Sequence, residues 1–209
     1  MNKLKIGALA SGRGSNVEAI LRNIKSGYLP CEMRIVISDN KDARVLKIAE
    51  EYGVKALYLD PGKRKHTLEP EREEEYARVL KEEEVELVVL AGFMRILKGA
   101  LLREFKNRIM NIHPSLLPSF KGLEAQRQAW EYGVKVAGCT VHFVDETVDG
   151  GPIILQKCVP VLEDDTPYTL AERILKEEHK IYSEAIKLFA EGRLKIEGRR
   201  VRILERENE

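Results

Sequence analysis

The sequence predicts an α/β fold: a doubly wound, mostly parallel sheet with helices on both faces and an antiparallel extension in the C-terminal half. Two observations support this prediction. In the first half, short apolar runs alternate with amphipathic stretches whose apolar residues recur at helical spacing, such as Val17, Ile20, Leu21 and Ile24. Near-continuous apolar runs such as "LVVLA" at residues 87–91 suit strands buried on both faces of a parallel sheet.

Strand-like runs and amphipathic stretches follow one another regularly in this first half. The expected strands span residues 4–10, 32–38, 55–59, 85–93 and 108–113. The expected helices span residues 16–27, 43–53, 70–84 and about 98–105. This β-α-β order predicts parallel strands that are joined by crossover helices.

The second half changes its pattern. A helix is expected over residues 122–133, and only a polar turn separates the next two expected strands, 135–144 and 151–161. So short a connection predicts that these two strands pair antiparallel. A long helix from about residue 168 to 190 and a terminal hairpin over residues 193–204 are expected to complete the fold.

Length and composition exclude several classes of protein. With 209 residues and no linker rich in Pro, Gly or Ser, the chain is expected to form a single domain over residues 1–209. The 35 Lys and Arg residues nearly balance the 34 Asp and Glu residues, so no basic excess indicates nucleic acid as a partner. No signal-peptide pattern and no run of about 18 apolar residues occurs. We therefore expect a cytoplasmic protein that acts on small molecules and does not bind membranes.

The three cysteines, Cys31, Cys139 and Cys158, are odd in number and form no CxxC pair. Each lies on an apolar run. This pattern predicts reduced, buried thiols rather than disulfides or a structural zinc site.

The stretch "ASGRGSN" at residues 10–16 joins the first expected strand to the first expected helix. Gly12 and Gly14 permit a tight turn there. The first N–H groups of the helix, with the side chains of Ser15 and Asn16, would form a cradle for an anion, and phosphate is the natural guest. The alternative is that these residues only cap the helix.

A dinucleotide-binding loop is a weaker interpretation of the same stretch. The fingerprint G-x-G-x-x-G requires a third glycine where this chain has Val17. Asp39 could imitate the acidic residue that binds the ribose in such proteins. The missing glycine nevertheless argues against a nicotinamide cofactor.

A second polar feature lies in "IMNIHPSLLPSF" at residues 109–120. Side chains two apart on a strand project to the same face, so Asn111 and His113 are expected to point the same way. Pro114 removes a backbone donor and should end the strand there. Both polar side chains are therefore expected at the carboxyl edge of the sheet.

Further ionisable residues follow on the next expected elements. Taken alone, His142 is more often a satisfied strand histidine, and Asp149 is more often a turn former. If Asp149 meets His113, however, the carboxylate would favour the charged imidazole and orient it for proton transfer. Glu178 and His179 in isolation are best interpreted as a solvated helix face.

Together these fragments identify a family. The chain resembles the phosphoribosylglycinamide formyltransferases, and the similarity is nearly full length. The matching fragments, in order, are "SGRGSN", "VVLAGFMRIL", "NIHPSLLPSFKG", "HFVDETVDGGPIILQ", "EEHKIY" and "GRLK". The resemblance implies formyl transfer from 10-formyltetrahydrofolate to the amine of glycinamide ribonucleotide in purine biosynthesis. It also implies a phosphate-binding half at about residues 1–100 and a folate-binding, catalytic half at about residues 101–209.

The resemblance assigns Asn111, His113 and Asp149 to the positions of the catalytic trio. His142 would be a supporting residue. The family chemistry needs no metal and no covalent nucleophile. We expect the Asn111 amide and a protonated His113 to stabilise an oxyanion, with Asp149 assisting proton transfer.

The resemblance also implies two sets of binding residues. The ribonucleotide would be bound by Gly14, Ser15, Asn16, Val17, Glu18 and Glu178, which revises the interpretation of Glu178. The folate would be bound by Met94, Arg95, Ile96, Leu97, Asn111, Asp145, Glu146, Thr147, Val148 and Asp149. Leu97 and Val148 would offer apolar walls, and Arg72 or a neighbouring basic residue would contact the folate carboxylates.

Several alternatives stay open. Glu124 stands where the family often has a histidine, so that position has no expected role. Other enzymes that use 10-formyltetrahydrofolate share the chemistry, namely hydrolases and formyltransferases acting on a different amine, but the hydrolases usually carry "HH" where this chain has His113-Pro114. A non-catalytic, Rossmann-like nucleotide-binding module is the alternative from another class. The expected partners are the two small-molecule substrates, and the chain is expected to be a monomer or a homodimer.

Overall fold

The structure is a computed structural model that describes residues 3–205. The chain divides into two compact units, Met1–Asn111 (unit 1) and Ile112–Glu209 (unit 2), each of which is described by itself. The boundary falls inside a strand that begins in unit 1. The expected single domain with halves divided near residue 100 stays a prediction.

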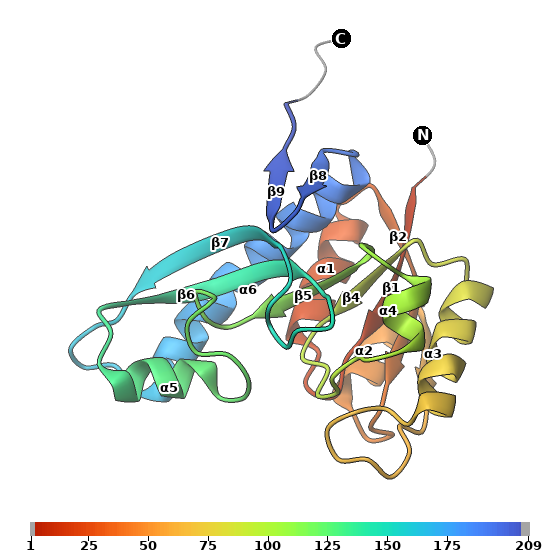
Figure 1. Ribbon diagram of the computed structural model, residues 1–209, viewed down its shortest axis with the longest axis horizontal. Helices are drawn as coiled ribbons and strands as arrows, with labels where there is room; N and C mark the ends of the chain where they lie inside the picture. Colours follow the sequence, from red (N-terminus) through yellow and green to blue (C-terminus); the bar gives the residue numbers. More distant parts are fainter. Residues whose placement is uncertain (1–2, 206–209) are drawn as a thin grey trace. The chain divides into compact units, whose positions relative to one another are not determined.

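Unit 1 contains the parallel part of the sheet (Figure 1). Its strands are arranged in the order β3-β2-β1-β4-β5, and all neighbouring pairs are parallel. The strands are β1 (Leu4–Leu9), β2 (Cys31–Ser38), β3 (Lys55–Tyr58), β4 (Leu87–Leu90) and β5 (Ile109–His113). The helices are α1 (Ser15–Lys25), α2 (Arg44–Glu51), α3 (Pro70–Glu82) and α4 (Ala100–Glu104).

The strand order reverses at β1. From β1 the chain moves outward through β2 to β3, and it then crosses back to β4 and β5 on the other side. Right-handed crossovers in both directions place helices on opposite faces, and α1 packs with α2 while α3 packs with α4. The carboxyl ends of β1 and β4 therefore form a topological switch point, where doubly wound sheets usually bind ligands.

The sequence patterns explain why these elements form. All four residues of β4 are buried, as expected for a strand covered on both faces. In α1 the apolar residues Val17, Ile20 and Leu21 are buried on one side of the helix. Burial of such a stripe contributes more to helix stability than intrinsic propensity does.

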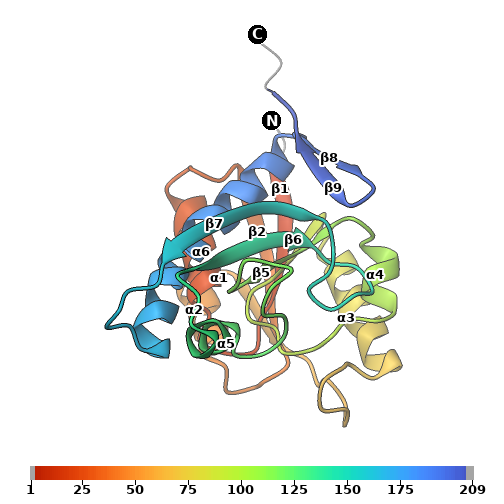
Figure 2. The same ribbon diagram turned by 60° about the vertical axis from the view of Figure 1, so that its left-hand side comes forward.

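Unit 2 contains the antiparallel extension. Strands β6 (Val136–Phe143) and β7 (Ile153–Pro160) pair antiparallel, and the C-terminal hairpin of β8 (Leu194–Glu197) and β9 (Arg200–Ile203) joins β7 through one parallel bridge. Helix α5 (Ala125–Tyr132) precedes β6. The long helix α6 (Pro167–Ala190) packs along β6 and β7, as Figure 2 shows.

The start of α6 is strongly specified. Thr166 and Thr169 form a reciprocal capping box, and Pro167 occupies the first turn, where its missing N–H costs nothing. Asp165, directly before the cap, accepts hydrogen bonds from both terminal nitrogens of Arg173. The guanidinium of Arg173 holds the pKa of Asp165 well below its usual range.

The predicted fold class is confirmed, and every predicted helix and strand occurs within three residues of its expected ends. One prediction about the cysteines was wrong. Cys31 and Cys139 are buried, and burial raises the pKa of each thiol to about 12. Cys158 is exposed.

None of the helices within residues 3–205 is both long and apolar enough to cross a membrane.

Gly138 in β6 provides a test of the packing in unit 2. A Cβ atom at this position would overlap the backbone carbonyl of Lys157 and come within 2.8 Å of the Leu116 side chain. We expect Gly138→Ala to lower the free energy of unfolding by about 1–3 kcal/mol, as overpacked cores usually do. Equilibrium denaturation checks this, with Gly12→Ala as the control, because nothing lies within 4 Å of a Cβ there. Equal free energies of unfolding for Gly138→Ala and Gly12→Ala would contradict the close packing described around Gly138.

Candidate active site

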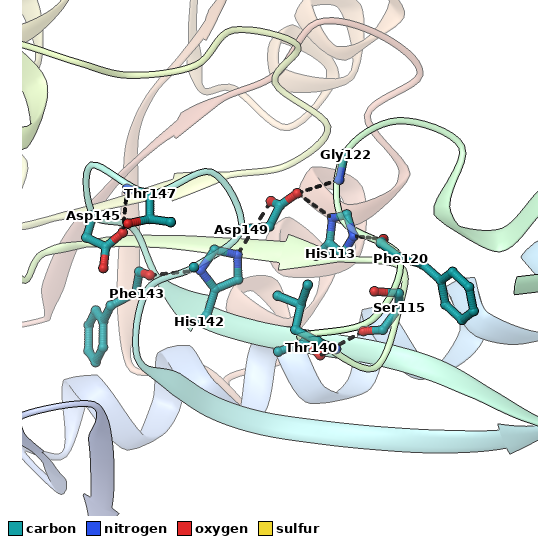
Figure 3. Close-up of polar contacts among 12 residues, drawn as sticks. His113, Ser115, Phe120, Gly122, Thr140, His142, Phe143, Asp145, Thr147 and Asp149 are labelled. Atoms are coloured by element: carbon teal, nitrogen blue, oxygen red, sulfur yellow. Dashed lines mark hydrogen bonds and ion pairs between the residues drawn. The ribbon is translucent and has the colours of Figure 1, made fainter. Parts of the chain in front are cut away.

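His113 is the last residue of β5, and its ring has two partners within unit 2 (Figure 3). It is only 5% exposed. Its Nε2 atom lies 2.9 Å from the carbonyl oxygen of Phe120, and its Nδ1 atom lies 3.6 Å from Oδ2 of Asp149. A carbonyl can only accept a hydrogen bond, so Nε2 must carry the proton. A second proton on Nδ1 would turn the contact with Asp149 into an ion pair.

Asp149 is held between two histidines. Its Oδ2 atom accepts a hydrogen bond of 2.8 Å from the backbone N–H of Gly122, and this same atom faces His113. Its Oδ1 atom lies 4.0 Å from Nε2 of His142. The carboxylate thus joins the loop after β6 to β5 and to the loop that follows it.

His142 is on β6 and is almost fully buried. Its Nδ1 atom lies 2.8 Å from the carbonyl oxygen of Phe143. Burial holds the pKa of His142 below its usual value of 6.5, and this effect outweighs the raising influence of Asp149. The two histidines beside one carboxylate therefore differ in environment.

Two residues of this cluster have unusual backbone conformations. Phe120 has φ 52° and Asp149 has φ 48°, both in the left-handed region that glycine favours. Asp tolerates this region better than a bulky aromatic residue does. Such strain persists only where the surrounding structure imposes it, and it gathers at functional sites.

The proline loop that follows His113 is fastened to β6 and β7. Thr140 is completely buried, and its hydroxyl donates to the carbonyl of Ser115 and accepts from the N–H of Leu117. Gln156 donates from Nε2 to the Leu117 carbonyl and to the Thr140 hydroxyl. The Leu117–Pro118 peptide bond is cis. This network positions the loop that brings Phe120 and Gly122 to the cluster.

Sequence reasoning missed Phe120, Gly122, Thr140 and Gln156. Phe120 and Gly122 act through backbone groups, which leave no mark in a single sequence. Thr140 was detectable in principle, because it is a polar residue within the apolar strand "VAGCTVHF".

In unit 1, the loop after β1 contains a glycine with a left-handed backbone conformation directly before α1. Gly14 precedes α1 with φ 78°, and a Cβ atom there would lie 2.7 Å from Cβ of Val45. Only glycine fits both the conformation and the space. Gly12 has neither constraint. Val17 is fully buried, so neither its side chain nor its backbone is open to a ligand.

The segment 94–97, also in unit 1, is tied to the ends of two other strands. The Met94 N–H donates to the hydroxyl of Ser11 at 2.8 Å, and Nε of Arg95 donates to Oδ2 of Asp39 at 2.6 Å. Asp39 therefore holds an arginine instead of imitating a ribose-binding acid. Leu97 is only 3% exposed, so it packs in the core of unit 1 and forms no apolar wall, whereas Met94 is 53% exposed.

The remaining predicted residues differ in their surroundings. Glu178 on α6 is buried, which excludes the solvated-face interpretation, and its charge contributes to the raised pKa of Cys139 after the larger effect of burial. Arg72 already pairs with Asp60 and Glu75, at 3.2 and 3.1 Å. Other predicted residues are placed in loops or partly buried: Ser15, Asn16, Glu18, Ile96, Asn111, Asp145, Glu146, Thr147 and Val148.

Within residues 3–205, no group of three or more His, Cys, Asp or Glu side chains is arranged to hold a metal ion.

Comparison with known proteins identifies the family. A sequence model of the family described as formyl transferase matches residues 4–186. The chain belongs to the formyl transferase family. The predicted family resemblance is thereby confirmed.

Three relatives illustrate the similarity. The chain is 43% identical over 195 residues to the trifunctional purine biosynthetic protein adenosine-3 of Gallus gallus, covering 93% of this chain but only 19% of that protein. It is 42% identical over 183 residues to the phosphoribosylglycinamide formyltransferase of Bacillus subtilis, covering 88% and 93% of the two chains. Glycinamide ribonucleotide transformylase 1 from Symbiobacterium toebii has a solved structure that matches with a TM-score of 0.93 and 56% identity, covering 98% and 95%.

The lowered pKa of His142 predicts a dependence of stability on pH. The folded protein keeps this imidazole neutral, whereas the unfolded chain takes up a proton near the ordinary value of 6.5. The contribution of the neutral His142 to the free energy of unfolding is therefore fully present above pH 6.5. It is lost as the pH falls below this value, by up to about 1.4 kcal/mol per pH unit. Denaturation at several pH values checks this. We expect the free energy of unfolding of His142→Asn to lose this dependence on pH, whereas the control His66→Gln, at an exposed residue, should keep it. The same pH dependence in the wild type and in His142→Asn would refute the claim.

Proposed function

We propose that this protein transfers the formyl group of 10-formyltetrahydrofolate to the amino group of N1-(5-phospho-D-ribosyl)glycinamide, a step of purine biosynthesis. The observation that supports this most is the cluster of His113, Asp149 and His142 in a member of the formyl transferase family. The names of the Bacillus subtilis and Symbiobacterium toebii relatives agree with this choice of acceptor.

The proposed reaction passes through a tetrahedral intermediate. The amine attacks the formyl carbon, a new C–N bond forms, and the formyl oxygen becomes an oxyanion. The intermediate then collapses, the bond from that carbon to folate N10 breaks, and N10 receives the proton that the amine gives up. The protein must therefore stabilise one oxyanion and move one proton.

Asn111 and His113 are the proposed donors to the oxyanion. They are two positions apart on β5, and alternate residues of a strand project to the same side. The carbonyl oxygen of Phe120 lies where an acceptor can receive a hydrogen bond from Nε2 of His113. We propose that the formyl oxygen takes this position during the reaction.

Asp149 is the proposed partner of the charged histidine. Its Oδ2 atom faces Nδ1 of His113, so the carboxylate would form an ion pair with the charged imidazole proposed to stabilise the oxyanion. The Gly122 N–H holds this carboxylate in place. His142, kept neutral by burial, would support Asp149 without competing for the proton.

The two substrates are proposed to use the loops already described. The phosphate of the ribonucleotide would bind the N–H groups at the start of α1, with Gly14, Ser15, Asn16 and Glu18 around it. The ribonucleotide would also contact Glu178. The folate would bind the segments 94–97 and 145–149, mainly through backbone groups and the exposed side chain of Met94.

The catalytic assignment predicts large losses of turnover. We expect His113→Ala and Asp149→Asn each to lower kcat by about 10²–10⁴-fold. Loss of the Asn111 amide should cost about 3 kcal/mol of transition-state stabilisation. An absorbance assay with 10-formyl-5,8-dideazafolate and glycinamide ribonucleotide measures this.

The exposed Asp164 provides the control variant, Asp164→Asn, which should retain full activity. Circular dichroism establishes that each variant is folded. Wild-type turnover by a folded His113→Ala or Asp149→Asn protein would refute the assignment. Formate as the only product, with no formylated ribonucleotide, would indicate the hydrolase instead, and NAD binding would indicate the Rossmann-like module.

The phosphate cradle predicts a loss of ribonucleotide affinity. Gly14→Ala would place a Cβ atom against Val45 and strain the turn, and Asn16→Ala would remove a polar side chain from the cradle. We expect both variants to raise Kd for glycinamide ribonucleotide about tenfold or more, with less effect on folate binding. Isothermal calorimetry with each substrate separately checks this, and unchanged affinity in Asn16→Ala would exclude its proposed role.

A further inference from the structure

The turn between β8 and β9 contacts the loop that carries Asp149. Nη2 of Arg199, in this turn, donates a hydrogen bond of 2.8 Å to the backbone carbonyl of Gly150, 49 positions earlier in the sequence. Strand β9 also pairs with the first residue of β7, Ile153, so the hairpin lies beside the point where this loop rejoins the sheet (Figure 1). The C-terminal hairpin therefore reaches a loop that is proposed to serve folate binding and catalysis.

The loop between β6 and β7 is closed at its base and at its tip by its own backbone. At the base, the Phe143 N–H donates to the carbonyl of Pro152 at 2.9 Å. At the tip, the Thr147 N–H donates to Oδ1 of Asp145 at 2.8 Å, and the Gly150 N–H donates to the carbonyl of Thr147 at 3.0 Å. None of these three bonds involves the carbonyl of Gly150. That carbonyl faces the hairpin instead.

The backbone at residues 149–151 is costly to hold in one conformation. Asp149 has φ 48°, which persists only where the surrounding structure imposes it. Two glycines follow, and glycine loses more conformational freedom on folding than any other residue. Gly150 is buried, so its carbonyl needs a hydrogen-bond partner. The guanidinium of Arg199 supplies this partner directly after the strained residue.

The Asp149 carboxylate has three neighbours whose distances depend on this backbone (Figure 3). It accepts from the Gly122 N–H at 2.8 Å, and it lies 3.6 Å from Nδ1 of His113 and 4.0 Å from Nε2 of His142. A displacement of about 1 Å in an active site can cost about 100-fold in rate. Movement of residues 149–150 would therefore alter the contact with His113.

We propose that Arg199 is a positioning residue for formyl transfer. Through the Gly150 carbonyl it holds the loop 145–149, and with it the Asp149 carboxylate, in the geometry for folate binding and proton transfer. The inference rests on the proposed function, which assigns this loop to the folate. One nitrogen of the guanidinium makes the contact, so a single donor on a long side chain is sufficient.

Two substitutions of Arg199 test this single bond. Arg199→Met keeps a long side chain and removes every donor, whereas Arg199→Lys keeps one donor. We expect Arg199→Met to lower kcat, and to raise the KM for 10-formyltetrahydrofolate, each by about three- to tenfold, the effect of losing one ordinary hydrogen bond. The KM for glycinamide ribonucleotide should change by less than about twofold, because its proposed phosphate contacts lie in unit 1. Arg199→Lys should recover most of the wild-type kcat and folate KM.

Arg200→Gln is the matched control. Arg200 is the next residue, is also exposed, and belongs to the backbone pairing between β9 and β7. Its substitution should leave kcat and both KM values unchanged. Hydrogen exchange of the peptide covering residues 144–152 reports on the loop itself. We expect faster exchange in Arg199→Met and wild-type exchange in Arg199→Lys and Arg200→Gln, with circular dichroism showing that all variants are folded.

The kinetic outcomes decide the inference. Unchanged kcat and folate KM in Arg199→Met, equal losses in Arg200→Gln, or no recovery in Arg199→Lys would overturn it. If the wild type transfers no formyl group to glycinamide ribonucleotide, the proposed function fails. Calorimetry with the non-reactive 5,8-dideazafolate then tests the positioning role separately. Weaker binding by Arg199→Met than by Arg199→Lys would support that role, and equal binding would overturn it.

Discussion

The carboxylate of Asp149 is the contact on which the arrangement of the polar cluster in unit 2 depends. It accepts from the Gly122 N–H and faces one nitrogen of His113 and one of His142. These contacts join two loops that are far apart in the sequence. The Phe120 carbonyl is the partner of the other ring nitrogen of His113.

The two histidines beside this carboxylate lie in different environments. His142 is buried on β6 and has its pKa lowered by that burial. His113 has an acceptor at each ring nitrogen.

In unit 1 the loops are joined by a different interaction, the ion pair between Arg95 and Asp39. A buried ion pair is weak evidence for stability, but here the same guanidinium also donates to two backbone carbonyls. The arginine therefore joins the segment 94–97 to the backbone at Arg64 and Lys65. Ser11 adds a link from the loop after β1 to Met94. These contacts connect the loops at the switch point of the sheet.

Much of the fold followed from periodicity. The apolar stripe of α1, the continuous apolar run of β4 and the short turn between β6 and β7 each predicted an element and its pairing correctly. The exposure of Cys158 was not predictable, because an apolar run does not reveal which of its residues the tertiary structure covers. The burial of Leu97 likewise depends on packing that its own neighbours in the sequence do not reveal.

The candidate site likewise combines features that the sequence predicts with features that only the tertiary structure sets. The sequence by itself determined that Asn111 and His113 share one strand and that Pro114 ends it, because strand alternation and proline act locally. Only the tertiary structure decided that Asp149 reaches His113, that Phe120 and Gly122 contribute backbone groups, and that Arg95 is paired rather than available. Those contacts join residues distant along the chain, and their geometry is set by how whole elements pack.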